Sequence, residues 1–359
     1  MRYPSTRRES LQGLKSPIKD ASFPTHPGLW LDKFIQTTDK EDTEAKAVLV
    51  RQATEIAEPS AYRAFFERYK QSLVRAPGPV YVAEGESLGR FVVGLGAASV
   101  LETSITLHRT YGVPYIPGSA LKGLASSYAA TRLEDQEKKW SRKFEGGKTE
   151  RGDYQKALFG DTEQSGLIVF YDALPLPKKY QLDKDVITVH HPEYYRGDPK
   201  PPADWDSPTP VPFITARGRF LFALGLNPVA SDNLTEALVW LELAAELLRR
   251  ALREAGIGAK TTIGYGRFDL QPFARLEPPR SEAFKAITDL IEFLKWNTVD
   301  VHLPKMADLW FQLTKEEKET LGPVLKEKML SERVLKSPRM KQARVRSANV
   351  EPMLSELGF

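Results

Sequence analysis

The sequence predicts an α+β fold built from alternating helices and strands. Leucine and alanine recur at helical spacing over Leu234–Ala255, which predicts a long helix. Short runs of β-branched and aromatic residues, Gly166–Ala173 and Phe220–Leu226, predict strands. With 359 residues, 41% of them hydrophobic, the chain can bury a substantial core in one large domain or two.

The chain before residue 81 is expected to be an addition to that core. Residues 1–28 carry Lys and Arg among Pro and Ser, which predicts a mobile basic arm. Residues 29–80 are predicted to be a helical region. Its clearest helix has one apolar face, formed by Tyr62, Phe65, Phe66, Tyr69 and Leu73. The APGPV segment, residues 76–80, breaks the helical pattern and is typical of a junction.

The core itself is predicted to span residues 81–275. Its first strand or strand pair is expected within Phe91–Leu107, where an apolar run precedes alternating apolar and polar residues. A short helix is expected to begin at Ser119, and the last strand lies within Thr262–Leu270. The predicted order is therefore β, α, β, β, α, β. This is the ferredoxin-like arrangement of RNA-recognition modules, which meet single-stranded RNA with their sheet face or loops.

Two stretches are expected to be insertions in this core. Nine of the 26 prolines lie within residues 174–212. A long proline-rich stretch inside a compact domain is more often functional or disordered than part of the scaffold. The charged segment Lys138–Asp153 is predicted to be a second, solvated insertion.

A glycine-rich loop, Gly256–Gly266, has the sequence GIGAKTTIGYG. Glycine permits positive φ and close backbone approach, so N–H groups of this loop can face an anion, and Lys260 adds a positive charge. The loop follows a helix and precedes a strand, which is the reverse of the order in nucleotide-binding loops. The alternative is structural: Gly256 ends the helix, and Gly264 and Gly266 mark a strand bulge.

A second anion site is predicted at the start of the short helix. The sequence YIPGSALKG, residues 115–123, places two prolines before Ser119, which is expected to be the N-cap. The N–H groups of the first turn, the serine hydroxyl and Lys122 together suit a phosphate.

The composition excludes several classes of protein. The absence of cysteine excludes disulfides, thiolate catalysis and cysteine-ligated metal sites. A net charge of +4 favours a polyanionic partner only mildly. The sequence contains neither an apolar run of membrane-spanning length nor the apolar core of a signal peptide. A soluble, cytoplasmic protein without membrane contact and without a cofactor is therefore expected.

Five motifs, in this order along the chain, carry a family resemblance: YIPGSALKG, ALFGD, FYDALP, DVITVHHPEYY and GIGAKTTIGYGRF. They lie between Arg90 and Leu270. Together they resemble the RAMP superfamily of CRISPR proteins, and within it the sixth subunits of Cmr, or type III-B, effector complexes. Members commonly carry an arginine soon after the PGS-LKG motif, where this chain has Ser126 and Ser127.

The resemblance implies a modified RNA-recognition fold with an inserted thumb or hairpin and added N- and C-terminal helices. It implies a place among other Cmr subunits, near one end of a multisubunit filament that serves antiviral defence. The subunit would bind the 3′ region of the guide (CRISPR) RNA and the matching target RNA. Carried onto this sequence, the residues expected to meet guide phosphates are Ser119, Lys122, Gly258, Lys260 and Thr261. Those expected near the guide–target duplex are His190, His191, Tyr194, Tyr195 and Arg196, with Arg217 and Arg219 as weaker candidates.

Because RAMP relatives include ribonucleases, an enzyme is the alternative. His190 and His191 with Asp172 and Asp185 would form either a metal site or a general acid and base. Adjacent histidines on a strand point to opposite faces, however, so they do not readily share one metal. The loop after the first predicted strand, RTYGVP, has no aspartate where the resembling nuclease subunit carries one. We therefore expect neither catalysis nor a metal.

Residues 276–359 are predicted to be a C-terminal helical extension. Phe284, Ile287, Leu290, Ile291 and Leu294 mark an amphipathic helix. Lys326–Arg346 is rich in Lys and Arg, which is typical of a solvated helix face. A contact with RNA or with a neighbouring subunit is the functional alternative, and it would make the chain mainly a structural adaptor.

Overall fold

The computed structural model describes residues 16–18, 20, 22, 24–35, 42–133, 138–145, 148–189, 201, 203, 209–229, 233–277 and 280–359. The chain divides into two compact units, Met1–Leu276 and Glu277–Phe359. Each unit has its own hydrophobic core.

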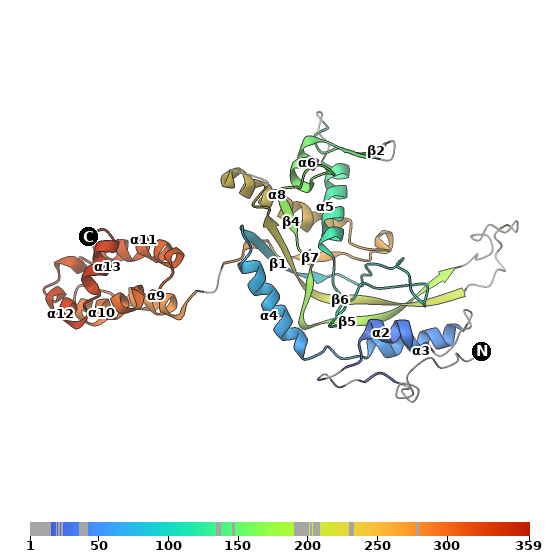
Figure 1. The fold of residues 1–359 in the computed structure, drawn as a ribbon, viewed down its shortest axis with the longest axis horizontal. Helices are drawn as coiled ribbons and strands as arrows, with labels where there is room; N and C mark the ends of the chain where they lie inside the picture. The colour runs from blue at the N-terminus through green and yellow to red at the C-terminus, as the bar shows by residue number, and fades with distance from the viewer. Residues whose placement is uncertain are drawn as a thin grey trace. The chain divides into compact units, whose positions relative to one another are not determined.

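The first unit combines helices with an antiparallel sheet (Figure 1), so the predicted mixture of helix and sheet is confirmed. Its α-helices are α2 (Pro27–Lys33), α3 (Thr43–Thr54), α4 (Ala61–Val74), α5 (Gly118–Arg132), α6 (Asp153–Phe159) and α8 (Leu234–Glu254). Its strands are β1 (Val80–Ser87), β2 (Arg142–Glu145), β3 (Lys148–Arg151), β4 (Ile168–Phe170), β5 (Leu174–Val189), β6 (Thr209–Leu226), β7 (Phe268–Leu270) and β8 (Ala274–Arg275).

The main sheet has the strand order β4-β6-β1-β7, with antiparallel pairs throughout. β1 pairs with β6 from Val80 opposite Gly225 to Glu86 opposite Arg219. β5 also pairs with β6, and β8 pairs with β1. β2 and β3 form a separate two-stranded sheet.

Helices cover both faces of the main sheet. α5 and α8 lie on one side, and α4 lies on the other (Figure 1). Because successive side chains of a strand point to opposite faces, β6 contributes to two cores. Phe220 and Phe222 belong to the core that contains α5 and α8, whereas Leu221 and Ala223 pack with Tyr62 of α4. The face that α5 and α8 leave free is therefore partly covered by α4.

Two helix predictions are confirmed by the burial pattern. α4 buries Tyr62, Phe66 and Leu73, which lie on one face of the helix. Asn233 caps the start of α8, because its side chain accepts a hydrogen bond from the Glu236 N–H, and the helix buries an almost continuous stripe of Leu and Ala. Gly256 follows this helix with a φ of 81°, so the prediction that Gly256 ends it is also confirmed.

The predicted position of the first strand is wrong. The strand is β1, Val80–Ser87, and Phe91–Leu107 forms no regular strand. Most of the apolar residues that suggested a strand are nevertheless buried, and Phe91 forms an isolated bridge with Ala216. The backbone turns at Gly94, where φ is 81°, so the segment packs as a folded loop instead of an extended strand.

Both predicted insertions contain regular structure. Within 174–212, Leu174–Val189 is β5 and pairs with β6, which begins at Thr209. The prolines there are tolerated because β5 and the start of β6 form an outlying two-stranded ribbon. The outer edge of such a ribbon faces no further strand, so a residue without an N–H donor can be accommodated there. Lys138–Asp153 contains the β2–β3 hairpin. The last predicted strand is shorter than expected, because Thr261–Ile263 forms a 3-10 turn and β7 begins at Phe268.

The second unit is helical. Its helices are α9 (Glu282–Phe293), α10 (Val299–Trp310), α11 (Lys315–Ser331), α12 (Met340–Arg346) and α13 (Val350–Glu356). α9 confirms the amphipathic helix predicted from the sequence. The basic stretch is partly neutralised, because Arg339 and Arg346 pair with the buried Asp300 at 3.4 and 3.2 Å, and Arg344 pairs with Glu351. Among the described helices of the whole chain, none is long and apolar enough to cross a membrane.

Candidate nucleic-acid interface

The glycine loop is fixed by its own backbone and by the segment after β1. Ile257 donates to the Gly266 carbonyl at 2.8 Å, Ala259 donates to Val92 at 2.9 Å, and Gly266 donates to Arg90 at 3.0 Å. Gly258, Gly264 and Gly266 have positive φ. A Cβ on Gly258 would lie 2.2 Å from the Val92 carbonyl oxygen. Gly258 and Gly266 are therefore required by packing, whereas no described heavy atom lies within 4 Å of a Cβ placed on Gly264. The interpretation of Gly264 and Gly266 as a strand bulge is wrong, because both follow the 3-10 turn Thr261–Ile263 and precede β7.

Lys260 is held in a defined orientation by this loop. It is half-buried, its φ of 62° is left-handed, and its Nζ lies 5.6 Å from the centroid of the Phe213 ring. No ion pair with a carboxylate is formed by Lys260 within the described residues. Thr261 follows at the start of the 3-10 turn. The loop therefore presents an unneutralised cation next to an exposed Gly258.

A clamp ties the glycine loop to β5. The Tyr265 hydroxyl donates to Asp185 Oδ2, and Arg90 contacts the same oxygen at 3.0 Å. Burial raises the pKa of the Asp185 carboxyl, but hydrogen bonds from Tyr265, the Val186 N–H and Arg90 outweigh it, so the net pKa is lowered. Sequence reasoning missed Arg90 and Tyr265, because nothing in the sequence shows that they meet Asp185.

This clamp predicts a pH-dependent contribution to stability. Asp185→Asn is expected to lower the free energy of unfolding by about 1–2 kcal/mol at neutral pH, because it removes a charged acceptor from Arg90 and Tyr265. A lowered carboxyl pKa contributes stability that is present above the unfolded pKa and lost as the pH falls through the folded pKa. Urea unfolding should therefore be measured from about pH 7 to about pH 3. The free energy of unfolding of the wild type should approach that of the variant below about pH 4. A constant difference across this range would contradict the assignment.

The start of α5 differs from the predicted anion site. Pro117 is the N-cap, so the prediction that Ser119 caps the helix is wrong, and Ser119 lies exposed in the first turn. The Gly118 N–H donates to Asp172 Oδ1 at 2.7 Å, so a carboxylate already occupies this helix end. The physical reason is the close approach of β4, because a Cβ on Gly118 would lie 2.1 Å from the Phe170 carbonyl oxygen.

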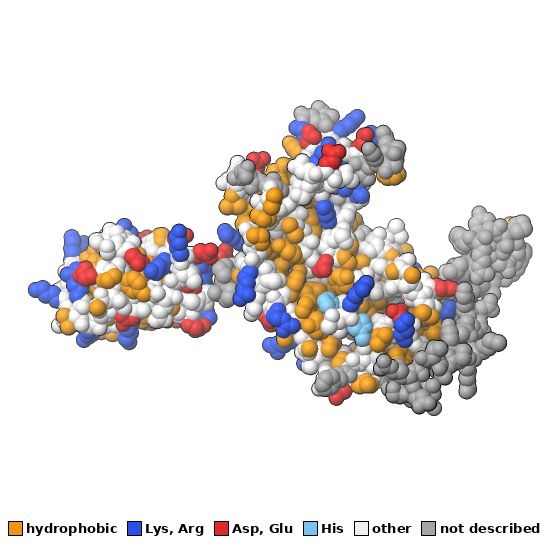
Figure 2. All heavy atoms as spheres, in the orientation of Figure 1, with side chains coloured by type: hydrophobic (Ala, Val, Ile, Leu, Met, Phe, Trp, Pro, Cys, Tyr) orange, Lys and Arg blue, Asp and Glu red, His pale blue; other side chains and the backbone are white. Residues whose placement is uncertain are grey.

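Lys122 instead belongs to a cluster of cations formed with the β2–β3 hairpin. Burial and the charge of Arg151 lower the pKa of Lys122. Burial and the charge of Arg142 lower the pKa of Arg151 in turn, while Asp161 opposes this. Arg142 and Arg151 are cross-strand partners, and Arg151 donates to the Gly160 carbonyl at 2.7 Å. Lys and Arg side chains, with some acidic ones, are visible around β2, α5 and α6 in Figure 2.

A buried pair of polar side chains fixes this cluster. Ser126 Oγ donates to Gln155 Oε1 and Gln155 Nε2 donates to the Ser126 carbonyl, both at 2.9 Å. These bonds join α5 to α6, and Lys122 lies one helical turn before Ser126 on the same face. Sequence reasoning missed Arg142 and Arg151. The sequence feature that could have revealed them is the Gly146-Gly147 pair, because two glycines between two short strand-forming segments are typical of a hairpin turn.

The other predicted contacts are spread along β5 and β6. Arg217 and Arg219 were expected just before a strand, but they lie inside β6. Arg217 pairs with Asp183 and Arg219 pairs with Glu84, both at 2.7 Å, so acidic side chains already neutralise them. The predicted contacts His190, His191, Tyr194, Tyr195 and Arg196 lie outside the described residues.

The acidic residues of the alternative metal site are both engaged. Asp172 accepts the Gly118 N–H, and Asp185 accepts from Tyr265 and Arg90. The described residues contain no group of three or more His, Asp or Glu side chains that could hold a metal ion.

A protein-family model matches the part of the chain that contains the main sheet and the glycine loop. The RAMP superfamily model matches residues 78–269, which run from just before β1 into β7. This is more than half of the chain, and the chain belongs to the RAMP superfamily.

Its relatives in that superfamily include two Cmr6 proteins. The chain is 30% identical over 291 residues to "CRISPR system Cmr subunit Cmr6" of Pyrococcus furiosus, covering 67% of this chain and 80% of the relative. It is 23% identical over 241 residues to the Cmr6 subunit of Saccharolobus solfataricus, covering 64% and 74%. A chain in the structure of the type III-B Cmr-beta complex bound to cognate target RNA matches with a TM-score of 0.48 and 21% identity, covering 68% of this chain and 80% of that one.

Proposed function

We propose that this chain is a non-catalytic, RNA-binding subunit of a type III-B CRISPR effector ribonucleoprotein. It holds the 3′ region of the guide RNA and its duplex with target RNA, next to other Cmr subunits. The observation that carries this proposal is the presence of cations without carboxylate partners in the described part of the RAMP core: Lys122 with Arg142, and Lys260. RNA phosphates would supply the missing negative charge. The similarity to Cmr6 proteins supports the assembly in which this would occur.

The first test is RNA co-purification from cells that express the chain with its effector partners. The double variant Lys122→Ala, Lys260→Ala is expected to retain assembly but to lose nuclease protection of the 3′ portion of the guide. For the isolated chain, affinity for single-stranded RNA should fall about tenfold or more at low salt. The slope of log affinity against log salt should drop by roughly 1.4, because each lost phosphate contact contributes about 0.7.

The control for this test removes the same number of charges from the second unit. Lys285→Ala, Lys305→Ala changes exposed residues of α9 and α10 and should leave protection and salt slope unchanged. Unchanged protection in the Lys122, Lys260 variant would contradict the proposal. A salt-independent affinity in the wild type would favour a structural adaptor instead.

We also propose that the chain does not cleave RNA. The engagement of Asp172 and Asp185 in structural hydrogen bonds supports this, because neither carboxylate is free to act as a general base. Specific cleavage of target RNA by the purified chain, abolished by His190→Ala or His191→Ala, would overturn it.

The finer description of the fold is part of the proposal. The order β1, α5, β4, β6, α8, β7 and the sheet order β4-β6-β1-β7 support a ferredoxin-like core spanning 81–275. The β5–β6 ribbon would be its inserted hairpin. Residues 1–28, 29–80 and 276–359 would be the basic arm, the helical region and the C-terminal extension.

A further inference from the structure

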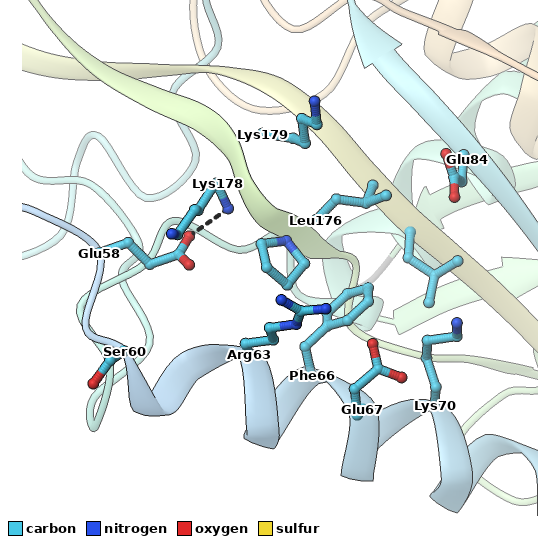
Figure 3. Close-up of a pocket in the computed structure, with 12 residues that line it drawn as sticks. Glu58, Ser60, Arg63, Phe66, Glu67, Lys70, Glu84, Leu176, Lys178 and Lys179 are labelled. Atoms are coloured by element: carbon cyan, nitrogen blue, oxygen red, sulfur yellow. Dashed lines mark hydrogen bonds between the residues drawn. The ribbon is translucent and has the colours of Figure 1, made fainter. Parts of the chain in front are cut away.

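A groove lies on the sheet face that α4 partly covers. Its volume is about 550 Å³. Figure 3 shows the residues that line it. One wall is α4, with Arg63, Phe66 and Lys70, and the other is formed by Leu176–Lys179 of β5. None of the residues predicted to bind RNA lines this groove.

The β5 wall departs from regular strand geometry. Pairing of β5 with β6 shifts register between Pro175 and Tyr180, so the intervening residues bulge out of the strand. Lys178 at the centre of this bulge has a left-handed φ of 61°. Its N–H donates to Glu58 Oε2 at 2.9 Å. This hydrogen bond from the segment before α4 holds the bulge, and the strained backbone is typical of a functional surface.

The charges of the groove do not balance. Glu58 accepts the Lys178 N–H, and Glu84 pairs with Arg219 at 2.7 Å. By contrast, Arg63, Lys70 and Lys179 form no ion pair with any carboxylate of the described chain. Glu67 is the acidic lining residue that offsets part of this charge. An occupant with carboxylates would therefore complement the groove.

The floor of the groove is apolar but is unsuited to nucleobases. Phe66 is 4% exposed and Leu221 is 6% exposed, and Leu176 and Pro177 complete the floor. Base stacking needs an accessible ring face, which a ring as buried as that of Phe66 does not offer. The lining residues also include no Asn or Gln side chain to read a base edge. An aliphatic surface flanked by unpaired cations is complementary to a peptide in which an apolar side chain lies between acidic side chains.

We infer that this groove docks an acidic, partly apolar segment of another polypeptide, a neighbouring subunit of the effector complex. This rests on the proposed function in that it requires the chain to work in a multisubunit assembly. The docked segment places an apolar side chain against the more accessible Leu176 and Pro177, and its carboxylates pair with Arg63, Lys70 and Lys179.

The test is charge reversal in the full chain, co-expressed with the other subunits and followed by native mass spectrometry. Arg63→Glu, Lys179→Glu is expected to lower subunit occupancy about tenfold or more, while single-stranded RNA binding by the isolated chain stays unchanged. Glu67→Gln is expected to keep or raise occupancy. Lys285→Glu, Lys305→Glu is the matched control and should assemble normally.

Unchanged occupancy in the groove variant overturns the inference, and a parallel loss of RNA binding reassigns the groove to RNA. Failure of the wild type to assemble or bind RNA would instead overturn the proposed function.

A photo-crosslinking amino acid at Ser60, which lines the groove, identifies the occupant directly. The expected product is a crosslink to a subunit peptide in which acidic residues flank an apolar one. The same amino acid at exposed Ser127 on α5 should not yield this peptide. A crosslink to RNA, to a second copy of this chain, or to a basic peptide would overturn the inference.

Discussion

Replacing Gly266 with alanine is expected to lower the free energy of unfolding of the first unit by about 3–5 kcal/mol. The φ of Gly266 is 73°, which penalises any residue with a Cβ. That Cβ would also lie 2.0 Å from the Ile257 carbonyl oxygen and 2.7 Å from the Ile257 nitrogen. Backbone atoms cannot move away as a flexible side chain can, so the loop would have to open. Urea unfolding of the full chain measures the loss, with the second unit's transition as an internal reference.

Gly264 is the matched control, because it separates backbone conformation from packing. Its φ is 95°, but no described heavy atom lies within 4 Å of the position of its Cβ. Gly264→Ala should therefore cost only about 1 kcal/mol, the conformational penalty. Equal losses in the two variants would show that packing against Ile257 does not constrain the loop.

The local patterns of the sequence predicted the helices well. α4 and α8 each carry an apolar stripe at helical spacing, and this pattern depends only on neighbours along the chain. Phe91–Leu107 shows the limit of this reasoning. Most of its apolar residues are buried as expected, but bends at Gly94 and Glu102 turn the segment into a loop. Burial alone does not distinguish a loop from a strand.

The candidate site was predictable only in part. Lys122 and Lys260 lie in recognisable motifs, and in the described structure both lack carboxylate partners. The sequence does not show that Asp172 occupies the start of α5 or that Arg219 pairs with Glu84, because these partners are brought together by sheet pairing. Arg151 was missed for the same reason, since its place beside Lys122 depends on how the β2–β3 hairpin and α6 pack on α5.

Ser126→Arg is expected to destabilise the first unit by about 3–5 kcal/mol. Ser126 is 2% exposed and its partner Gln155 is 0% exposed, so an arginine there would break two hydrogen bonds and bury a charge. It would also approach Lys122, whose pKa is already lowered by burial and by the charge of Arg151. Denaturant unfolding of the purified variant measures the loss.

Ser127→Arg is the neighbouring comparison, and it should behave in the opposite way. Ser127 is exposed on α5, so an arginine there adds a solvated cation and should change stability by less than about 0.5 kcal/mol. If α5 faces RNA, the added charge should raise affinity for single-stranded RNA about twofold to fivefold at low salt, with a steeper salt slope. Higher affinity from Ser127→Arg together with unfolding by Ser126→Arg would indicate that α5 accepts an added cation on its exposed face but not on the face that packs against α6. Stable folding of Ser126→Arg would contradict the structural role of the Ser126–Gln155 pair.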